Sequence, residues 1–186
     1  MNPIKIFFFA LATIIGFEDA AIVSRKVSVK MNPVNKTFEI IQEDLFSIVI
    51  LPEDSTRVTD ELQRIMDVQK IGGTESANCF TIEKMLLINA GRQMNANITV
   101  SYSNPKILVD AEIDLDTLAH GEFSMMDIPE WNIHSSDAVL KEEYWVWSAG
   151  KSVTFVMEPF QHIPYKYLRH QHSILPYWEE LTVTSP

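Results

Sequence analysis

The chain has 186 residues, of which 46% are hydrophobic and 22% charged, and this composition is typical of one domain that buries a continuous core. Its formal net charge is -10 at pH 7 and no cluster of Lys and Arg offsets it, so nucleic-acid binding is not expected. The single cysteine, Cys79, excludes an intramolecular disulfide and any cysteine-based zinc site. We expect Cys79 to be a small buried residue, with a bridge to another chain as the alternative.

The first residues have the pattern of a signal peptide. Lys5 precedes an unbroken apolar run over residues 6–17, which ends at two acidic residues. This run is shorter than the roughly 20 apolar residues that a membrane-spanning helix needs. We therefore predict that residues 1–20 are a signal peptide, and that residues 21–186 form a single secreted domain with no stable membrane span after cleavage.

The cleavage site itself is less clearly marked than the apolar run. Gly16, Ala20 and Ala21 are all small enough to precede it, although acidic residues lie between them. An uncleaved anchor that holds an extracellular domain is the alternative.

Two Asn-X-Thr triplets agree with the secretory route. They begin at Asn35 and Asn97, and such triplets accept N-linked glycans in secreted eukaryotic proteins. We expect a glycoprotein with glycans at both residues. The alternative for each triplet is an ordinary polar turn or strand position.

The first half of the secreted domain is predicted to contain strands followed by two helices. Residues 27–31 and 37–51 are rich in β-favouring residues and are separated by a break at residues 32–33. A helix with a Ser or Thr cap is expected over 55–71, where two glycines end it, and another over 79–90. We expect both helices to lie on one side of a sheet.

The second half returns to the alternation that is typical of strands. Residues 97–103 and 106–115 are expected to form a hairpin, and 120–126 one further strand. Residues 142–157 are expected to form another hairpin, and the chain from 159 onward an irregular, aromatic-rich tail. The fold class that follows is α+β: an antiparallel sheet of about five to seven strands with hairpins, and two helices packed on one face.

The hairpin over 142–157 carries a register prediction. A three-residue loop would end at Gly150 in the left-handed region and would pair Trp147 with Lys151 and Trp145 with Val153. One face of the hairpin would then hold Trp145, Trp147, Val153, Phe155 and Met157.

Aromatic residues are concentrated in the second half of the chain, since all four tryptophans lie from residue 131 onward. Exposed aromatic rings bind sugars, lipids or proteins, whereas buried rings fill a sheet core. We expect a secreted, non-enzymatic binding or interaction protein with an aromatic-rich surface, no cofactor, and an unidentified protein or a small apolar or carbohydrate molecule as partner. The candidate ligand-binding residues are Trp131, Tyr144, Trp145, Trp147, Tyr165, Tyr167 and Trp178.

Two alternatives to a binding protein remain open. A metal-dependent extracellular enzyme could use His162, His170 and His172, although no HExxH or Gly-X-Ser-X-Gly motif is present. A structural protein could assemble through Cys79 or an exposed strand edge. The carboxylates of Asp110, Glu112, Asp114 and Asp116 alternate along a predicted strand, and we interpret them as a solvated face rather than a metal site.

Overall fold

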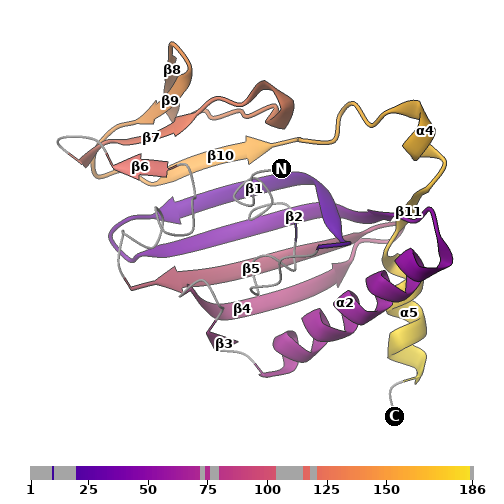
Figure 1. Cartoon of the computed structure of the whole chain (residues 1–186). Helices are drawn as coiled ribbons and strands as arrows, with labels where there is room; N and C mark the ends of the chain where they lie inside the picture. The colour runs from indigo at the N-terminus through magenta and orange to yellow at the C-terminus, as the bar shows by residue number, and fades with distance from the viewer. Residues whose placement is uncertain are drawn as a thin grey trace.

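The computed structural model describes Ala10 and residues 20–71, 74–75, 80–103, 115–117 and 121–184. For residues 74–75, 115–117 and 184 only the backbone is described. Within these residues the chain forms two antiparallel sheets with helices beside the larger one, so the predicted α+β fold class is confirmed (Figure 1).

The larger sheet has the strand order β10-β1-β2-β5-β4-β3 in the described residues, and β11 pairs with one end of β2. The smaller sheet has the order β6-β7-β9-β8. The strands of the larger sheet are β1 (Val23–Asn32), β2 (Thr37–Ile48), β3 (Thr74–Glu75), β4 (Phe80–Asn89), β5 (Met94–Tyr102), β10 (Val153–Met157) and β11 (Gln171–Ser173). Those of the smaller sheet are β6 (Leu115–Thr117), β7 (Phe123–Met126), β8 (Ala138–Lys141) and β9 (Tyr144–Trp147).

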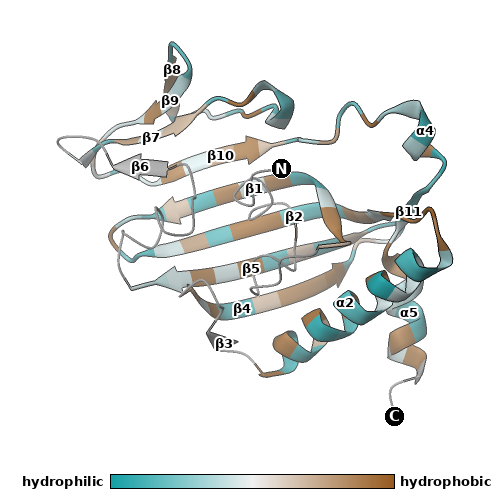
Figure 2. Ribbon diagram, viewed as in Figure 1, coloured by the Kyte–Doolittle hydropathy of each residue, from teal (hydrophilic) through white to brown (hydrophobic). Residues whose placement is uncertain are grey.

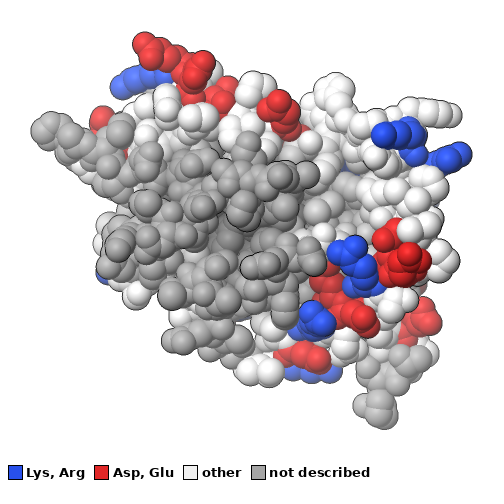
Figure 3. Space-filling model, viewed as in Figure 1, with Lys and Arg blue, Asp and Glu red and all other residues white. Residues whose placement is uncertain are grey.

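The described helices are α2 (Pro52–Ile71), α4 (Tyr165–Leu168), α5 (Leu175–Thr184) and the short 3-10 helix η3 (Pro129–Trp131). Helix α2 contacts both β4 and α5. It turns Val58, Leu62 and Ile65 into the core, and Figure 2 shows the hydrophobic and hydrophilic sides of this helix. Lys, Arg, Asp and Glu gather along its outer side in Figure 3. Among the described residues, no helix is long and apolar enough to cross a membrane.

The core of the larger sheet follows the two-residue period of its strands. In β5 the alternate residues Met94, Ala96, Ile98, Val100 and Tyr102 are buried. Phe38 of β2 packs against the rings of Phe80 and Tyr102, with centroids 6.4 and 5.6 Å away. The burial of these large side chains provides most of the stability of the sheet.

The helix predicted over 79–90 is wrong, because residues 80–89 form strand β4. The pairing of β4 with β5 shifts between Ile82 and Lys84. This β-bulge places Met85 with Ile82 among the buried residues. The three-residue spacing that suggested a helix therefore comes from a bulge in a strand. The second helix near the sheet is instead α5, which follows the strands in sequence.

The hairpin predicted over 142–157 is also wrong in its pairing, although both of its strands are present. Strand β9 pairs with β7 and β8, whereas β10 pairs with β1 in the other sheet. Gly150 has the expected positive φ of 73° and lies in the turn between them. Trp147 is nevertheless placed over β10, where its Nε1 donates to the Thr154 carbonyl at 3.1 Å. The predicted inward residues of β10, Val153, Phe155 and Met157, are all buried.

The C-terminal segment is more regular than the tail that we expected. After an irregular stretch over 158–164 it forms α4, then β11, then α5. Strand β11 pairs with β2, and Tyr177 and Trp178 of α5 pack against the core. The segment is therefore part of the domain and not an appendage to it.

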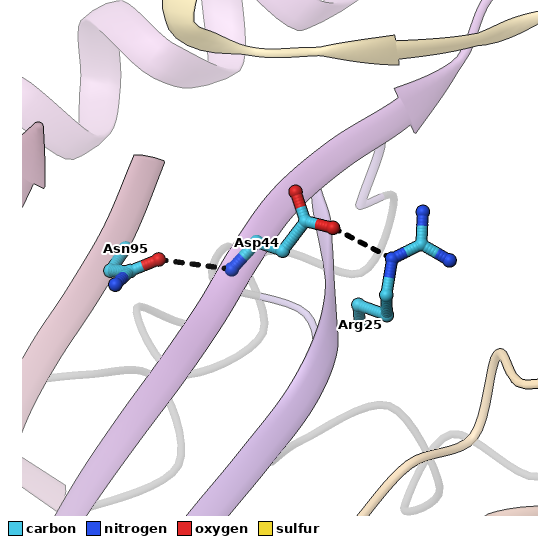
Figure 4. A network of polar contacts seen from close by, with 3 residues as sticks. All are labelled: Arg25, Asp44 and Asn95. Atoms are coloured by element: carbon cyan, nitrogen blue, oxygen red, sulfur yellow. Dashed lines mark hydrogen bonds and ion pairs between the residues drawn. The ribbon is translucent and has the colours of Figure 1, made fainter. Parts of the chain in front are cut away.

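Strand β2 changes its neighbour near Asp44, whose contacts with Arg25 and Asn95 are drawn in Figure 4. Before this point it pairs with β5 as far as Gln42, and after it residues 46–48 pair with β11. Asp44 has a φ of 55°, which is costly for a residue with a side chain. Its backbone N–H donates to Asn95 Oδ1 at 3.0 Å, and its carboxylate accepts from Arg25 Nε at 2.7 Å. Where β2 leaves β5, the Asn95 side chain therefore accepts the hydrogen bond that a backbone carbonyl accepts in a regular sheet.

Replacement of Asn95 tests this arrangement. Asn95→Ala leaves the Asp44 N–H without its acceptor, so we expect the free energy of unfolding to fall by about 1–3 kcal/mol. Asn97→Ala is the matched control, since Asn97 is exposed on the same strand and its loss is expected to change stability by about 0.5 kcal/mol or less. Denaturant unfolding of protein from a non-glycosylating host measures both. Equal effects of the two substitutions would contradict the role of Asn95.

Candidate functional site

A pocket of about 870 Å³ lies where the end of β2, helix η3 and the segment before α4 meet. Ala20, the last residue of the predicted signal peptide, and Ala21 and Val23, which follow it, also line the pocket. Most of the lining is apolar, and the volume is within the range of about 300–1,000 Å³ that small-molecule sites occupy. We call this cavity the Trp131 pocket. Its apolar lining includes Phe46, Ile48, Ile128, Trp131, Phe160 and Ile163.

The wall from β2 depends on the change of neighbour at Asp44. Beyond this residue Phe46 and Ile48 line the pocket while their backbones pair with Ser173 and Gln171 of β11. The Phe46 ring meets Phe160 edge-on, with centroids 5.3 Å apart. The Arg25 guanidinium lies 5.2 Å from the centroid of the same Phe46 ring. Phe46 is therefore held by contacts on more than one side.

The opposite wall is formed by Trp131, which is 9% exposed. Pro129 begins the short helix η3, and Asn132 ends it in the left-handed conformation with a φ of 47°. The Trp131 carbonyl accepts from the Glu158 N–H at 2.9 Å, just after β10. The backbone at Trp131 is consequently held against the end of β10 in the larger sheet, and the burial of its side chain completes this wall of the pocket.

Polar side chains are placed mainly at the edge of the Trp131 pocket. Asp54, Arg57, Glu130 and His162 all line it, and the last three are exposed. The Asp54 carboxylate accepts from the Leu51 and Ile50 N–H groups, both at 2.9 Å, and these hydrogen bonds lower its pKa. The edge thus carries charges of both signs. It can hold the polar end of a molecule whose apolar part lies deeper.

The structure brings only some of the predicted ligand-binding aromatics together. Trp131 and Tyr167 both line the pocket. Tyr165 is 88% exposed and Tyr144 41% exposed, and neither lines it. Trp147 is completely buried, so it cannot form part of a binding surface.

The remaining two predicted aromatics are half-buried away from the pocket. Trp145 Nε1 donates to Asp127 Oδ1 at 2.9 Å in the smaller sheet. Trp178 lies in α5 and packs against the core.

Sequence reasoning missed Phe46, Phe160 and the isoleucines of the pocket. For Phe46 and Ile48, the sequence did offer a signal. The apolar residues at the end of β2 are nearly continuous, which is typical of a strand that is covered on both faces.

Both predicted glycosylation residues are exposed. Asn35 lies in the turn between β1 and β2, and Asn97 lies on the outward face of β5. The turn is at the far end of this hairpin from Phe46, because Phe46 pairs with Val23 where β1 begins. A glycan at Asn35 would leave the pocket open.

The histidines of the C-terminal segment do not form a metal centre within the described residues, where no group of three or more His, Cys, Asp or Glu is suitably placed. His162 lines the pocket, while His170 Nε2 accepts from Arg169 Nε at 3.0 Å. His172 is exposed on β11. Cys79 and the predicted acidic strand face of Asp110, Glu112, Asp114 and Asp116 lie outside the side chains that the structure describes.

Comparison of the chain with protein-family models, with curated proteins and with solved structures gives no match.

Substitution of two aromatics on β9 tests their assignment to core and surface. Trp147→Ala removes a buried ring and its hydrogen bond, so we expect the free energy of unfolding to fall by about 3–5 kcal/mol. Tyr144→Ala, on the same strand, is expected to cost about 1 kcal/mol or less because its side chain is partly exposed. Thermal or denaturant unfolding compares the two variants. Similar losses would contradict the burial described for β9.

Proposed function

We propose that the protein is a secreted, non-enzymatic binding protein that holds an apolar small molecule in the Trp131 pocket. The observation that carries this proposal is the pocket of about 870 Å³, in which aromatic and aliphatic side chains form the wall and charged groups lie at the edge. This combination is the usual design of a small-molecule site.

An apolar ligand fits the lining better than a carbohydrate. A sugar needs several hydrogen-bonding groups around its ring, and a polar group that is buried without a partner costs about 1–3 kcal/mol. The deeper wall offers Phe46, Phe160 and Ile163, which have no side-chain hydrogen-bonding groups. A molecule with an apolar chain or ring system and one polar end would leave no such group unpaired.

The secretory part of the proposal is supported by the pattern of residues 1–20 and by the exposure of Asn35 and Asn97. Neither asparagine lines the Trp131 pocket. Glycosylation at these residues is therefore compatible with ligand entry.

Binding of a fluorescent fatty acid, 11-(dansylamino)undecanoic acid, tests the proposal. We expect saturable binding that dodecanoic acid or dodecanol displaces and that N-acetylglucosamine oligomers do not. Tyr167→Ala removes an aromatic part of the wall and is expected to weaken binding about tenfold, which corresponds to about 1.4 kcal/mol.

The control is Tyr165→Ala, since Tyr165 belongs to the same short helix, is highly exposed and does not line the pocket. The affinity of the Tyr165→Ala variant for the probe should equal that of the unmodified protein. Absence of saturable binding, displacement by the sugar alone, or equal weakening by both substitutions would contradict the proposed site.

A further inference from the structure

Glu61 of α2 is the only Asp, Glu, Lys or Arg side chain that is buried among the described residues, with 7% of its surface exposed. Its carboxylate lies against the start of the secreted domain. Oε2 accepts from the Ala21 backbone N at 2.5 Å and from the Ile22 backbone N at 3.2 Å. A buried carboxylate is costly unless a positive charge or several hydrogen bonds compensate it.

We propose that the chain is cut between Ala20 and Ala21 during secretion, and that Glu61 then binds the new α-ammonium group of Ala21 as a buried ion pair. This inference rests on the secretory part of the proposed function. It identifies a processing site in the chain and an ionic partner for the buried carboxylate of Glu61.

The cut is an ordinary peptide hydrolysis by an endopeptidase of the secretory route. Water adds its oxygen to the carbonyl carbon of Ala20 as the C–N bond to Ala21 breaks, and the Ala21 nitrogen takes up protons to become an ammonium group. The same nitrogen that now donates one N–H to Glu61 would thus carry a full positive charge. Charge-assisted hydrogen bonds of this kind are roughly twice as strong as neutral ones.

In the uncut chain, the positive charges that act on Glu61 among the described residues are those of Arg57 and Arg64. Burial raises the pKa of Glu61 to about 7, against the lowering effects of the Ala21 and Ile22 N–H groups and of Arg57 and Arg64. These two arginines belong to the same helix as Glu61, whereas the start of the domain contributes only backbone N–H groups. A folded-state pKa above the unfolded value means that the uncut protein loses stability as the pH rises from 4.5 to about 7.

Ala21 is also a better position for the new terminus than its neighbour. Ile22 is completely buried, so an ammonium group there would have to be buried together with its side chain. Ala21 is partly exposed and makes the shorter contact with Glu61. The geometry therefore favours cleavage of the Ala20–Ala21 bond over cleavage of the Ala21–Ile22 bond.

The first experiment is expression of the full chain in a secretory eukaryotic host, with mass-spectrometric sequencing of the terminus of the protein in the medium. We expect the mature chain to begin at Ala21. A terminus at Phe17, Ile22 or any other residue would overturn the inference, whereas the ligand-binding proposal is tested separately by the probe-binding measurement. Full-length protein retained in cells would overturn the secretory proposal and this inference together.

The second experiment tests the ion pair directly and does not depend on secretion. Removal of a cleavable fusion yields one protein that begins at Ala21 and another with a single extra Gly before it. The ammonium of the Ala21 protein should acquire a raised pKa and react with an amine reagent at pH 7.5 at least about tenfold more slowly than that of the Gly-extended protein. Equal rates would overturn the ion pair.

A stability measurement on the same two proteins adds a pH signature. Because pairing raises the folded-state pKa of the ammonium, its stabilisation is full below the unfolded value of about 8 and is lost as the pH rises through the raised value. The Ala21 protein should therefore unfold at a higher temperature at pH 7 and lose this advantage near pH 10. Glu61→Gln should remove the advantage, whereas Glu53→Gln in the exposed first turn of α2 should retain it. A difference that persists in Glu61→Gln would overturn the assignment of Glu61.

Discussion

The exchange of neighbours by β2 at Asp44 is the constraint that places Phe46 and Ile48 in the wall of the Trp131 pocket. One strand serves two neighbours in succession, β5 and then β11, so it joins the centre of the sheet to the C-terminal segment. The left-handed backbone of Asp44 is tolerated because the Asn95 side chain accepts a hydrogen bond from its backbone N–H, while its carboxylate pairs with Arg25. Without this local exchange, Phe46 could not lie in the wall of the pocket while its backbone pairs with β11.

The C-terminal segment closes the structure that β2 begins. Phe160 packs against Phe46, and β11 adds hydrogen bonds along the same part of the strand. Helix α5 then packs against α2, where the Ser55 hydroxyl donates to the Tyr177 hydroxyl at 3.1 Å. The pocket is consequently lined by residues that are far apart in the sequence but are held by one continuous set of strand and ring contacts. Such a preformed site binds a ligand without a large ordering cost.

Much of the fold could be predicted from the sequence, because alternation of apolar residues identifies strands directly. The strands predicted within 27–31, 37–51 and 120–126 and the alternation of buried residues in β10 all follow from it. The pairing of the strands with one another was harder to predict. The alternation of apolar residues in β9 and β10 is compatible with a hairpin and also with strands of two separate sheets. The helix predicted over 79–90 failed for a different reason, because a bulge near Glu83 gave a strand the spacing of a helix.

The candidate site was less predictable than the fold. Trp131 and Tyr167 were found by residue type alone, but the same reasoning also selected Trp147, which is completely buried. Residue type does not distinguish an aromatic of the core from one that lines a cavity. Phe46 and Phe160 are 114 positions apart in the numbering of the chain, and the pairing of β10 with β1, of β1 with β2 and of β2 with β11 brings them together. Pairing between segments so far apart in the sequence cannot be predicted from a local pattern of residues.

The most direct measurement of the central claim is an NMR experiment on protein with ¹³C-labelled isoleucine methyl groups, to which unlabelled dodecanoic acid is added. Ile48, Ile128 and Ile163 line the Trp131 pocket, whereas Ile41 of β2 and Ile88 of β4 are exposed, do not line the pocket and serve as internal controls. We expect intermolecular Overhauser contacts and shift changes at the methyl groups of the three pocket isoleucines and none at those of the two control isoleucines. Contacts at Ile41 or Ile88 alone, or none at any isoleucine, would contradict the proposed site.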